Sequence, residues 1–270
     1  MKVAFQGEPG AYSEEAGFGY FKSAEMVPQE TFEAVFAAVA SGQCASGLIP
    51  IENSLAGSIH QNYDLLLRNN LFIVGEYFLR VCHCLIGFPG VEKSSIKRVI
   101  SHPQALWQCA AYLGELGVIS EPVYDTAGSV KILKLGGDKT RAAIASKRAA
   151  EIYGMHILEE GIEDNPENYT RFLEIAPRPI EPVNDAKTSI VFSLKNQPGA
   201  LFNALKIFAE RDIDLTKIES RPLVGKIWEY LFYIDFIGAC GLRQTQEALD
   251  QLGEMALMLR VLGSYPRFKS

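Results

Sequence analysis

The chain has 270 residues, of which 48% are hydrophobic and 21% are charged, and its formal net charge is −6. This length suits two domains, each with a substantial core. Because the acidic balance comes with no basic run, we expect no nucleic-acid partner, and an anionic ligand would depend on local cations and helix N-termini. No apolar stretch is long enough to span a membrane, so we expect no membrane partner.

The number and positions of the cysteines indicate the redox state of the cellular compartment. Their odd number and scattered positions suit reduced thiols in a cytosol: Cys44, Cys82, Cys84, Cys109 and Cys240. The first residues form a strand-like run with no leader pattern, so we expect a cytoplasmic location.

The run Cys82-His83-Cys84 could suggest a metal site. Its period-2 spacing inside the apolar run 78–88 favours a buried strand instead, and the chain has neither a CxxC pair nor a second ligand pair. We therefore expect no metal ligands here.

Short apolar strands alternate with helices through the first 176 residues, which predicts a parallel α/β architecture. The predicted strands cover 2–6, 26–28, 46–51, two strands within 71–88, 98–101, 121–124, 142–146, 155–158 and 172–175. The predicted helices cover 12–16, 31–39, 58–65, 105–116, 126–135 and 147–153. A loose echo between 31–54 and 125–147 indicates two lobes of similar build.

Polar residues collect where these strands end. Asn53 and Ser54 follow one strand, and His102 lies at another strand-to-helix junction. In open α/β sheets, ligands bind off the carboxyl ends of strands. The alternative is that all three are helix caps or satisfied core residues.

The run Asn168 to Phe172 combines a hydroxyl, a guanidinium and an aromatic ring in consecutive positions. Arg171 can grip a carboxylate, Thr170 can donate a hydrogen bond, and Phe172 can pack on an unsaturated ring. Such a site suits a small anionic substrate. The alternative is an ordinary edge strand, in which Thr170 and Arg171 point to opposite faces.

Three prolines in six residues, at 177, 179 and 182, predict a spacer between domains. Beyond it the pattern changes to β-α-β-β-α-β, a ferredoxin-like module. Its strands are predicted at 187–194, 215–221, 228–236 and 258–263, and its helices at 198–208 and 243–255.

Taken together, the motifs resemble the prephenate dehydratase family, which includes the closely similar arogenate dehydratases, with a C-terminal ACT regulatory domain. The resemblance rests on five stretches in the family's order: 7–13, 49–54 with Gly57, 101–106, 168–172, and 219–222 downstream of 199–201. It implies a two-lobed, periplasmic-binding-protein-like α/β catalytic domain over 1–178, a linker over 179–186 and a ferredoxin-like ACT domain over 187–270. It also implies a homodimer or homotetramer that binds phenylalanine as an allosteric effector.

The family's functional threonine falls on Thr170, with Arg171 and Phe172 beside it, and its asparagine-serine pair falls on Asn53 and Ser54. The effector motifs fall on Gly199-Ala200-Leu201 and Glu219-Ser220-Arg221-Pro222. Asp214 departs from the asparagine that the family often has there.

The implied reaction turns prephenate into phenylpyruvate with loss of water and CO2, and it needs no cofactor. Thr170 is too weak an acid to protonate the leaving hydroxyl unaided, so Glu52, Glu8 or His102 is the expected proton source. Two alternatives stay open. One is arogenate as substrate, and the other is a small-molecule binding protein with an amino-acid sensor and no chemistry.

Overall fold

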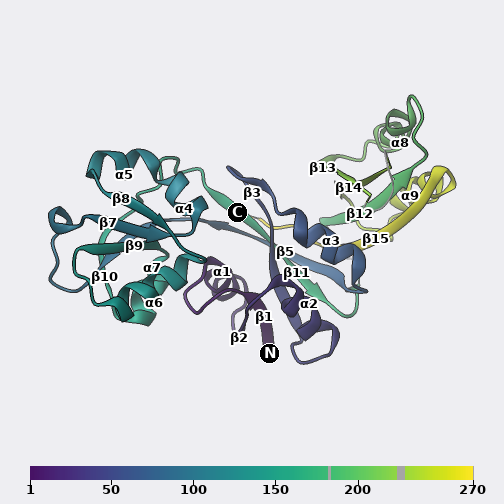
Figure 1. Cartoon of the computed structure of the whole chain (residues 1–270). Helices are drawn as coiled ribbons and strands as arrows, with labels where there is room; N and C mark the ends of the chain where they lie inside the picture. Colours follow the sequence, from purple (N-terminus) through teal and green to yellow (C-terminus); the bar gives the residue numbers. More distant parts are fainter. Residues whose placement is uncertain (182–183, 224–228, 270) are drawn as a thin grey trace. The chain divides into compact units, whose positions relative to one another are not determined.

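The computed structural model describes residues 1–181, 184–223 and 229–269 (Figure 1). The chain divides into two compact units, and each takes residues from separate parts of the sequence. The first comprises Met1–Tyr63 with Tyr77–Phe172, and the second comprises Asp64–Glu76 with Leu173–Ser270. The domain boundaries expected from the sequence remain a prediction. Within the described ranges, no helix is long and apolar enough to cross a membrane.

The first sheet has the strand order β2-β1-β3-β11-β5, with β4 paired to β3. Its elements are β1 (Lys2–Gln6), α1 (Tyr12–Tyr20), β2 (Glu25–Gln29), α2 (Phe32–Ala40), β3 (Ser46–Asn53), β4 (Gly57–Ser58), α3 (His60–Arg68), β5 (Phe72–Arg80) and β11 (Tyr169–Ala176). Strand β1 pairs in parallel with β2 and β3. Because β3 is buried over nearly its whole length, it reads as a continuous apolar run that ends in Glu52 and Asn53.

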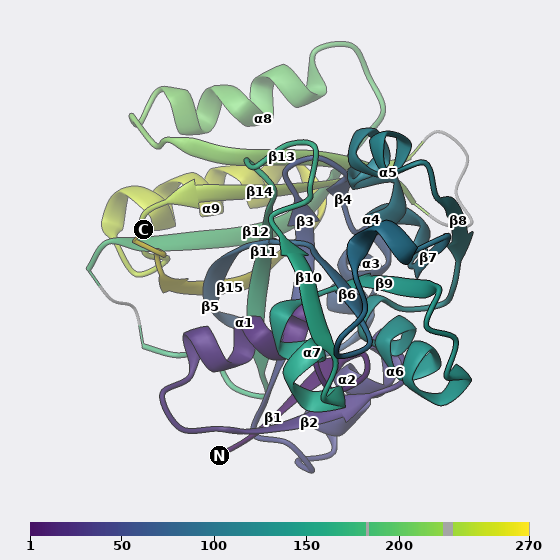
Figure 2. The ribbon, with the colours of Figure 1, turned by 90° about the vertical axis from the view of Figure 1, so that its left-hand side faces the viewer.

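The second sheet has the order β10-β6-β9-β7-β8. Its elements are β6 (Cys84–Gly87), η1 (Lys93–Ser95), β7 (Arg98–Ser101), α4 (Pro103–Gln108), α5 (Ala110–Leu116), β8 (Ile119–Pro122), α6 (Thr126–Gly136), β9 (Arg141–Ala145), α7 (Lys147–Tyr153) and β10 (His156–Glu160). Strand β7 is parallel to β8 and β9, whereas β6 is antiparallel to β9 and β10. Helices α6 and α7 lie beside β9 and β10 (Figure 2). The expected two-lobed α/β architecture is confirmed, with antiparallel strands added to the parallel ones.

The helix predicted over 105–116 is in fact two helices, because the chain leaves helical geometry at Cys109 (φ −119°, ψ 22°). Asp164 holds the break open. Its backbone N–H donates to Gln108 O at 2.8 Å, and its carboxylate accepts the amides of Ala111 (3.0 Å) and Tyr112 (3.3 Å). A side chain from a distant loop thus caps α5.

The buried strand predicted through Cys82, His83 and Cys84 begins only at Cys84. The backbone N–H and C=O of His83 bind groups of the segment 161–163 and not a neighbouring strand. Its N–H donates to Glu163 Oε2 at 2.8 Å, and its carbonyl accepts from Gly161 (3.0 Å) and Ile162 (3.1 Å).

The C-terminal part of the second unit is an antiparallel sheet with the order β13-β14-β12-β15. Its elements are β12 (Ala186–Leu194), α8 (Ala200–Ala209), β13 (Leu215–Pro222), β14 (Tyr230–Ile237), α9 (Arg243–Met255) and β15 (Ala256–Pro266). Both helices pack on one sheet face through a shared core that includes Phe192, Phe208, Phe236 and Leu252. The predicted ferredoxin-like βαββαβ module is confirmed. The strand start expected at Trp228 and the linker residues Pro182 and Val183 lie outside the described residues.

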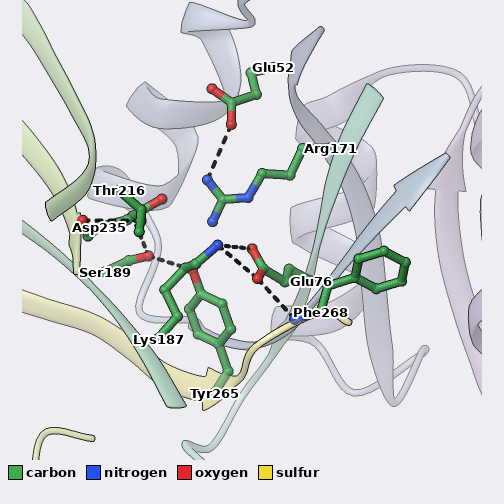
Figure 3. A network of polar contacts seen from close by, with 9 residues as sticks. All are labelled: Glu52, Glu76, Arg171, Lys187, Ser189, Thr216, Asp235, Tyr265 and Phe268. Atoms are coloured by element: carbon green, nitrogen blue, oxygen red, sulfur yellow. Dashed lines mark hydrogen bonds and ion pairs between the residues drawn. The ribbon is translucent and has the colours of Figure 1, made fainter. Parts of the chain in front are cut away.

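The other sheet face is polar and binds the segment Asp64–Glu76 of the same unit. The Lys187 ammonium lies 2.8 Å from the Glu76 carboxylate, whose Oε1 also accepts the Phe268 N–H at 3.1 Å (Figure 3). Ser189 beside them donates to Asp235 Oδ1 at 2.5 Å and lies 2.7 Å from Tyr265 Oη. Since the side chains of Glu76 and Lys187 are 0% and 9% exposed, breaking this pair would leave an uncompensated buried charge.

Two arginines hold helix α3 on this face. Arg260 donates to four carbonyls where α3 ends, those of Leu66 (3.2 Å), Leu67 (3.0 Å), Asn69 (2.8 Å) and Leu71 (3.0 Å). A guanidinium at a helix C-terminus satisfies carbonyls that have no intrahelical donor and complements the helix dipole. Arg221 Nη2 donates to Asp64 Oδ2, in the middle of α3, at 2.9 Å.

Close packing against this segment requires a glycine in β15. A Cβ on Gly263 would lie 2.0 Å from Ile73 O, whereas a Cβ on Gly253 in α9 would first meet Leu259 Cδ2 at 3.8 Å. Gly263→Ala should therefore lower the free energy of unfolding by about 1–3 kcal/mol, and Gly253→Ala should be neutral or stabilising. Urea unfolding of both variants checks this, and equal stability of the two would contradict the close approach.

Candidate active site

The Asn53 side chain joins the two polar motifs of the first unit. Its Nδ2 donates to Asn168 Oδ1 (2.8 Å), to Thr170 Oγ1 (3.0 Å) and to the Tyr169 carbonyl (3.2 Å). Its Oδ1 accepts from the amides of Leu55 (3.1 Å) and Ala56 (2.9 Å), which forms the turn after β3. One buried amide thus holds the end of β3 and the start of β11 together.

Ser54 supports the same junction from the backbone. Its N–H donates to Tyr169 O at 2.8 Å, and its hydroxyl donates to Glu167 O at 2.7 Å and accepts from Tyr169 N–H at 2.9 Å. Ser54 therefore orients β11 and does not line the cavity described next.

A cavity of about 550 Å³ opens beside Thr170, a size typical of small-molecule sites. The residues sharing its wall come from both lobes of the first unit: Gln6, Ala11, Tyr12, Ser13, Glu30, Thr31, Phe32, Glu33, Pro50, Asn53, Ile59, Gln61, Val81, His83, His102, Gln104, Ala105, Gln108, Tyr124, Asp125, Thr126, Thr170 and Phe172. The predicted site residues Asn53, Thr170, Phe172 and His102 are among them.

Three helix N-termini contribute backbone amide donors to the wall of this cavity. The first residues of α1, α2 and α6 line it, and the amides of a helix's first turn have no intrahelical acceptor. Among the described wall residues there is no Lys or Arg, and three are acidic, Glu30, Glu33 and Asp125. Several helix dipoles aimed at one space favour an anion without any cationic side chain.

Arg171 lies away from the cavity. Its side chain is 4% exposed, and its Nη1 lies 3.3 Å from Glu52 Oε1 (Figure 3). The strand alternation puts Thr170 and Phe172 on the cavity side and Arg171 on the other. Glu52, one of the three expected proton sources, is thus an ion-pair partner of Arg171.

The other two proton-source candidates differ in place. His102 lines the cavity and caps α4, with its Nδ1 accepting Gln104 N–H at 3.3 Å, so the neutral ring carries its proton on Nε2. Glu8 lines an adjacent hollow of about 520 Å³, where it pairs with Lys131 (3.2 Å) and accepts from Tyr124 Oη (3.2 Å).

Sequence reasoning missed three cavity residues, Tyr12, His83 and Gln108. Tyr12 Oη lies 2.7 Å from His83 Nδ1, and His83 Nε2 lies 2.8 Å from Gln108 Oε1. Gln108 Nε2 is buried and has no hydrogen-bond partner among the described residues, so its NH2 is left with donors to offer. The apolar run around His83 concealed its role, because the alternation pointed to a core strand.

Of the expected effector residues, Ala200 and Leu201 line a cavity of only about 100 Å³ in the second unit. Gly199 precedes them as the N-cap of α8 with φ +80°, a conformation that favours glycine. Pro222 and Ser220 pair across β13 and β14 with Tyr230 and Phe232, which line the same cavity.

The described part of the chain brings no group of three His, Cys, Asp or Glu side chains together as a metal site would need.

Comparison with known proteins agrees over both parts of the chain. The family model described as prephenate dehydratase matches residues 3–180, and the model described as ACT domain matches residues 188–254. A relative from Arabidopsis thaliana, arogenate dehydratase/prephenate dehydratase 2, chloroplastic, is 50% identical over 98% of this chain and 73% of its own length.

Two solved structures are also similar. One is described as GqqA, a novel type of quorum quenching acylase, with a TM-score of 0.93 and 36% identity over 99% of this chain and 98% of that one. The other is prephenate dehydratase in complex with L-Phe from Arthrobacter aurescens, with a TM-score of 0.91 and 31% identity over 99% of this chain and 90% of that one.

The cytoplasmic location expected from the cysteines is wrong on this comparison. Two of the similar relatives, at 50% and 49% identity, are named as chloroplastic proteins. Free cysteines indicate a reducing environment, which more than one compartment provides, so they do not identify the cytosol.

Removing the Asn53 side chain should weaken both the fold and the site. Asn53→Ala leaves the amides of Leu55 and Ala56 without their acceptor and Thr170 Oγ1 without its donor. We expect the free energy of unfolding to fall by roughly 2–3 kcal/mol in urea titrations. Asn70→Ala, at an exposed position, is the control, and equal stability of the two variants would argue against the junction.

Burial lowers the pKa of His83 below its ordinary value of 6.5. As pH falls below that value, His83 binds a proton in the unfolded chain but stays neutral in the folded chain. The free energy of unfolding therefore decreases as pH falls. The slope of that loss can approach about 1.4 kcal/mol per pH unit. Between pH 7 and pH 5, His83→Gln should lose less stability than the parent, whereas exposed His156→Gln should match the parent. Identical pH profiles for all three proteins would contradict a neutral buried His83.

Proposed function

Because this chain belongs to the prephenate dehydratase family, we propose that it converts prephenate into phenylpyruvate, water and CO2. The bond from the ring to its carboxylate breaks, and its electron pair enters the ring as the hydroxyl departs. One proton converts the departing hydroxide to water. The ring becomes aromatic, so the enzyme has to hold the dianion, assist the leaving hydroxyl and exclude bulk water.

The observation that carries this proposal is the Thr170 hydroxyl. Its oxygen accepts a hydrogen bond from Asn53 Nδ2 at 3.0 Å, so the hydroxyl hydrogen is left to donate into the cavity. A preorganised donor is most effective where negative charge develops, which here is the departing oxygen. His102 is the proton source we favour, since it lines the same cavity and, as the imidazolium form, can give its Nε2 proton to the departing oxygen and return to the neutral ring.

The carboxylates are held without cationic side chains on the wall. The first-turn amides of α1, α2 and α6 and the unpaired Gln108 amide supply donors, and Phe172 packs against the ring. Arg171 and Ser54 contribute indirectly by positioning the strands that carry the site. Arg171 pairs with Glu52 at the end of β3, and the Ser54 hydroxyl binds the Tyr169 N–H at the start of β11.

Arogenate is a second candidate substrate, and a specific observation favours it. Arogenate carries an ammonium where prephenate carries a keto oxygen, and Glu30, Glu33 and Asp125 give the wall acidic groups to meet a cation. The Arabidopsis relative is named for both activities.

Other reaction classes fit the geometry less well. An acylase, the activity named for one solved relative, needs a nucleophile with a base in hydrogen-bond reach. The Asn53 amide that contacts Thr170 donates and cannot take up a proton. A binding protein without chemistry would leave prephenate unchanged.

Parallel assays decide among these. The purified chain is given prephenate or arogenate, and phenylpyruvate and phenylalanine are measured separately. Phenylpyruvate from prephenate supports the proposal, and phenylalanine from arogenate alone supports the second candidate. Absence of both products from a folded, ligand-binding protein would leave the binding-protein alternative.

Thr170→Val tests the donor directly. The change keeps the side-chain shape and removes the hydrogen bond that strengthens as the hydroxyl departs. We expect turnover to fall about a hundredfold or more, with a much smaller change in KM. Thr140→Val, in the turn just before β9, removes a hydroxyl that donates to Asp138 Oδ1 away from the cavity, so its turnover should match the parent. Near-parental turnover of folded Thr170→Val would remove Thr170 from its role.

We further propose that the ferredoxin-like module binds phenylalanine as a feedback inhibitor in a homodimer or homotetramer. The cavity at Ala200 and Leu201, about 100 Å³, is below the roughly 300–1,000 Å³ of complete small-molecule sites, so a second copy would complete it. Strand β13, with Glu219 to Pro222, lies at the end of the sheet order, where another chain can pair. The solved Arthrobacter structure is a complex with L-Phe.

Arg221 gives this inhibition a route to the cavity. Its Nη2 holds Asp64 at 2.9 Å, while its buried Nε and Nη1 have no partner among the described residues and can receive an effector carboxylate. Asp64 lies on α3, and Ile59 and Gln61 at the start of that helix line the substrate cavity. An effector that alters the Arg221–Asp64 contact would therefore act on the helix that carries cavity residues.

Asp64→Asn should uncouple inhibition from binding. The variant keeps the size of the side chain and removes the charge that Arg221 holds. We expect calorimetry to show phenylalanine binding, while the inhibitory coupling falls by about 1–2 kcal/mol, or roughly 5- to 30-fold. Asp138→Asn, at an exposed turn, is the matched control. Parental inhibition of Asp64→Asn would exclude this route.

A further inference from the structure

His83 occupies a fixed place at the cavity wall that the reaction described above does not use. The residue is 2% exposed, and its backbone N–H is bound by Glu163 Oε2 at 2.8 Å. Its carbonyl accepts from the amides of Gly161 and Ile162. The imidazole is therefore held from the main chain, and its two nitrogens face defined partners.

Those partners determine which nitrogen carries hydrogen. Burial keeps the ring neutral by lowering its pKa, so the ring has one N–H. Nε2 lies 2.8 Å from Gln108 Oε1, which can only accept, so the hydrogen is on Nε2. Nδ1 then accepts from the Tyr12 hydroxyl at 2.7 Å.

A reversed arrangement is also chemically consistent. Tyr12 would donate to Cys82 O, which lies 3.0 Å from Oη, and the ring would donate from Nδ1. Gln108 would then turn its NH2 toward His83 and its carbonyl oxygen into the cavity. The shorter contact of Tyr12 is to Nδ1, and an anionic ligand requires donors from the wall, so both considerations favour the first arrangement.

We infer that His83 is a positioning residue for the dehydration: as the Nε2–H tautomer selected by Tyr12, it binds the Gln108 carbonyl and turns the Gln108 NH2 into the cavity toward the acceptor oxygens of the substrate. This inference rests on the proposed function for the identity of the ligand. The unpartnered, buried Gln108 Nε2 is the group that the arrangement presents. Tyr12 acts one step further out, through its hydrogen bond to Nδ1.

The tautomer can be read in the full-length protein without substrate. Long-range proton–nitrogen correlation of the four histidines, with His83 assigned by its loss in His83→Gln, should show hydrogen on Nε2. Hydrogen on Nδ1 would overturn the inference. Since this measurement needs no turnover, it stands whether or not the substrate has been identified correctly.

A double-mutant cycle tests the action through Gln108. His83→Leu should lower kcat/KM by roughly 10- to 100-fold, as expected for loss of a hydrogen bond to a charged ligand, and His83→Gln, which keeps a donor, should recover most of it. Gln108→Ala should cost a similar factor. The double variant His83→Leu with Gln108→Ala should be no worse than Gln108→Ala alone.

If the fold-loss in kcat/KM of the double variant equals the product of the two single fold-losses, His83 acts independently of Gln108, and the inference is overturned. If His83→Leu fails to fold, the comparison of His83→Gln with the parent still decides. A donor-keeping variant as inactive as Gln108→Ala, in a protein with parental thermal stability, would contradict the positioning role. If the parent chain converts neither prephenate nor arogenate, the proposed function fails, and the tautomer measurement alone judges His83.

Discussion

The first unit depends on one buried amide. Asn53 Nδ2 and Oδ1 together reach Asn168, Tyr169, Thr170 and the turn after β3, so a single side chain defines where β3 ends and where β11 begins. Leaving this buried amide without partners would cost its full desolvation free energy, which exceeds the net free energy that its hydrogen bonds contribute. The hydrogen bonds of the junction are therefore expected to form together. The same amide donates to one of the two lone pairs of the Thr170 hydroxyl, so this structural contact also orients that hydroxyl.

The cavity next to this junction is suited to anions although the chain carries a net charge of −6 and no Lys or Arg is found among the described wall residues. The N-termini of α1, α2 and α6 lie at its wall, and their backbone amides are donors fixed by the helices. Fixed donors need no reorganisation when charge shifts during the reaction, which a flexible lysine would require. Acidic side chains, Glu30, Glu33 and Asp125, lie on the same wall.

The second unit combines an antiparallel sheet with a segment from an earlier part of the chain. Its sheet binds α8 and α9 on the apolar face and the segment Asp64–Glu76 on the polar face, through Lys187, Arg221 and Arg260. The Lys187–Glu76 pair is buried, whereas the Arg221–Asp64 pair is partly exposed and Arg260 donates to backbone carbonyls.

The sequence by itself determined the classes of element and their order: α/β alternation, then βαββαβ, with Asn53, Thr170 and Phe172 as cavity residues. Periodicity and strand-end positions carry that information, because they depend on neighbours a few residues away. The tertiary structure decided which side chains contact one another. Arg171 meets Glu52 instead of lining the cavity, Asp164 breaks the helix at Cys109, and His83 turns from a strand residue into a neighbour of Gln108. Each of these depends on strand order and on loops brought together across tens of residues, up to 119 positions for Arg171 and Glu52, and no local pattern encodes such a pairing.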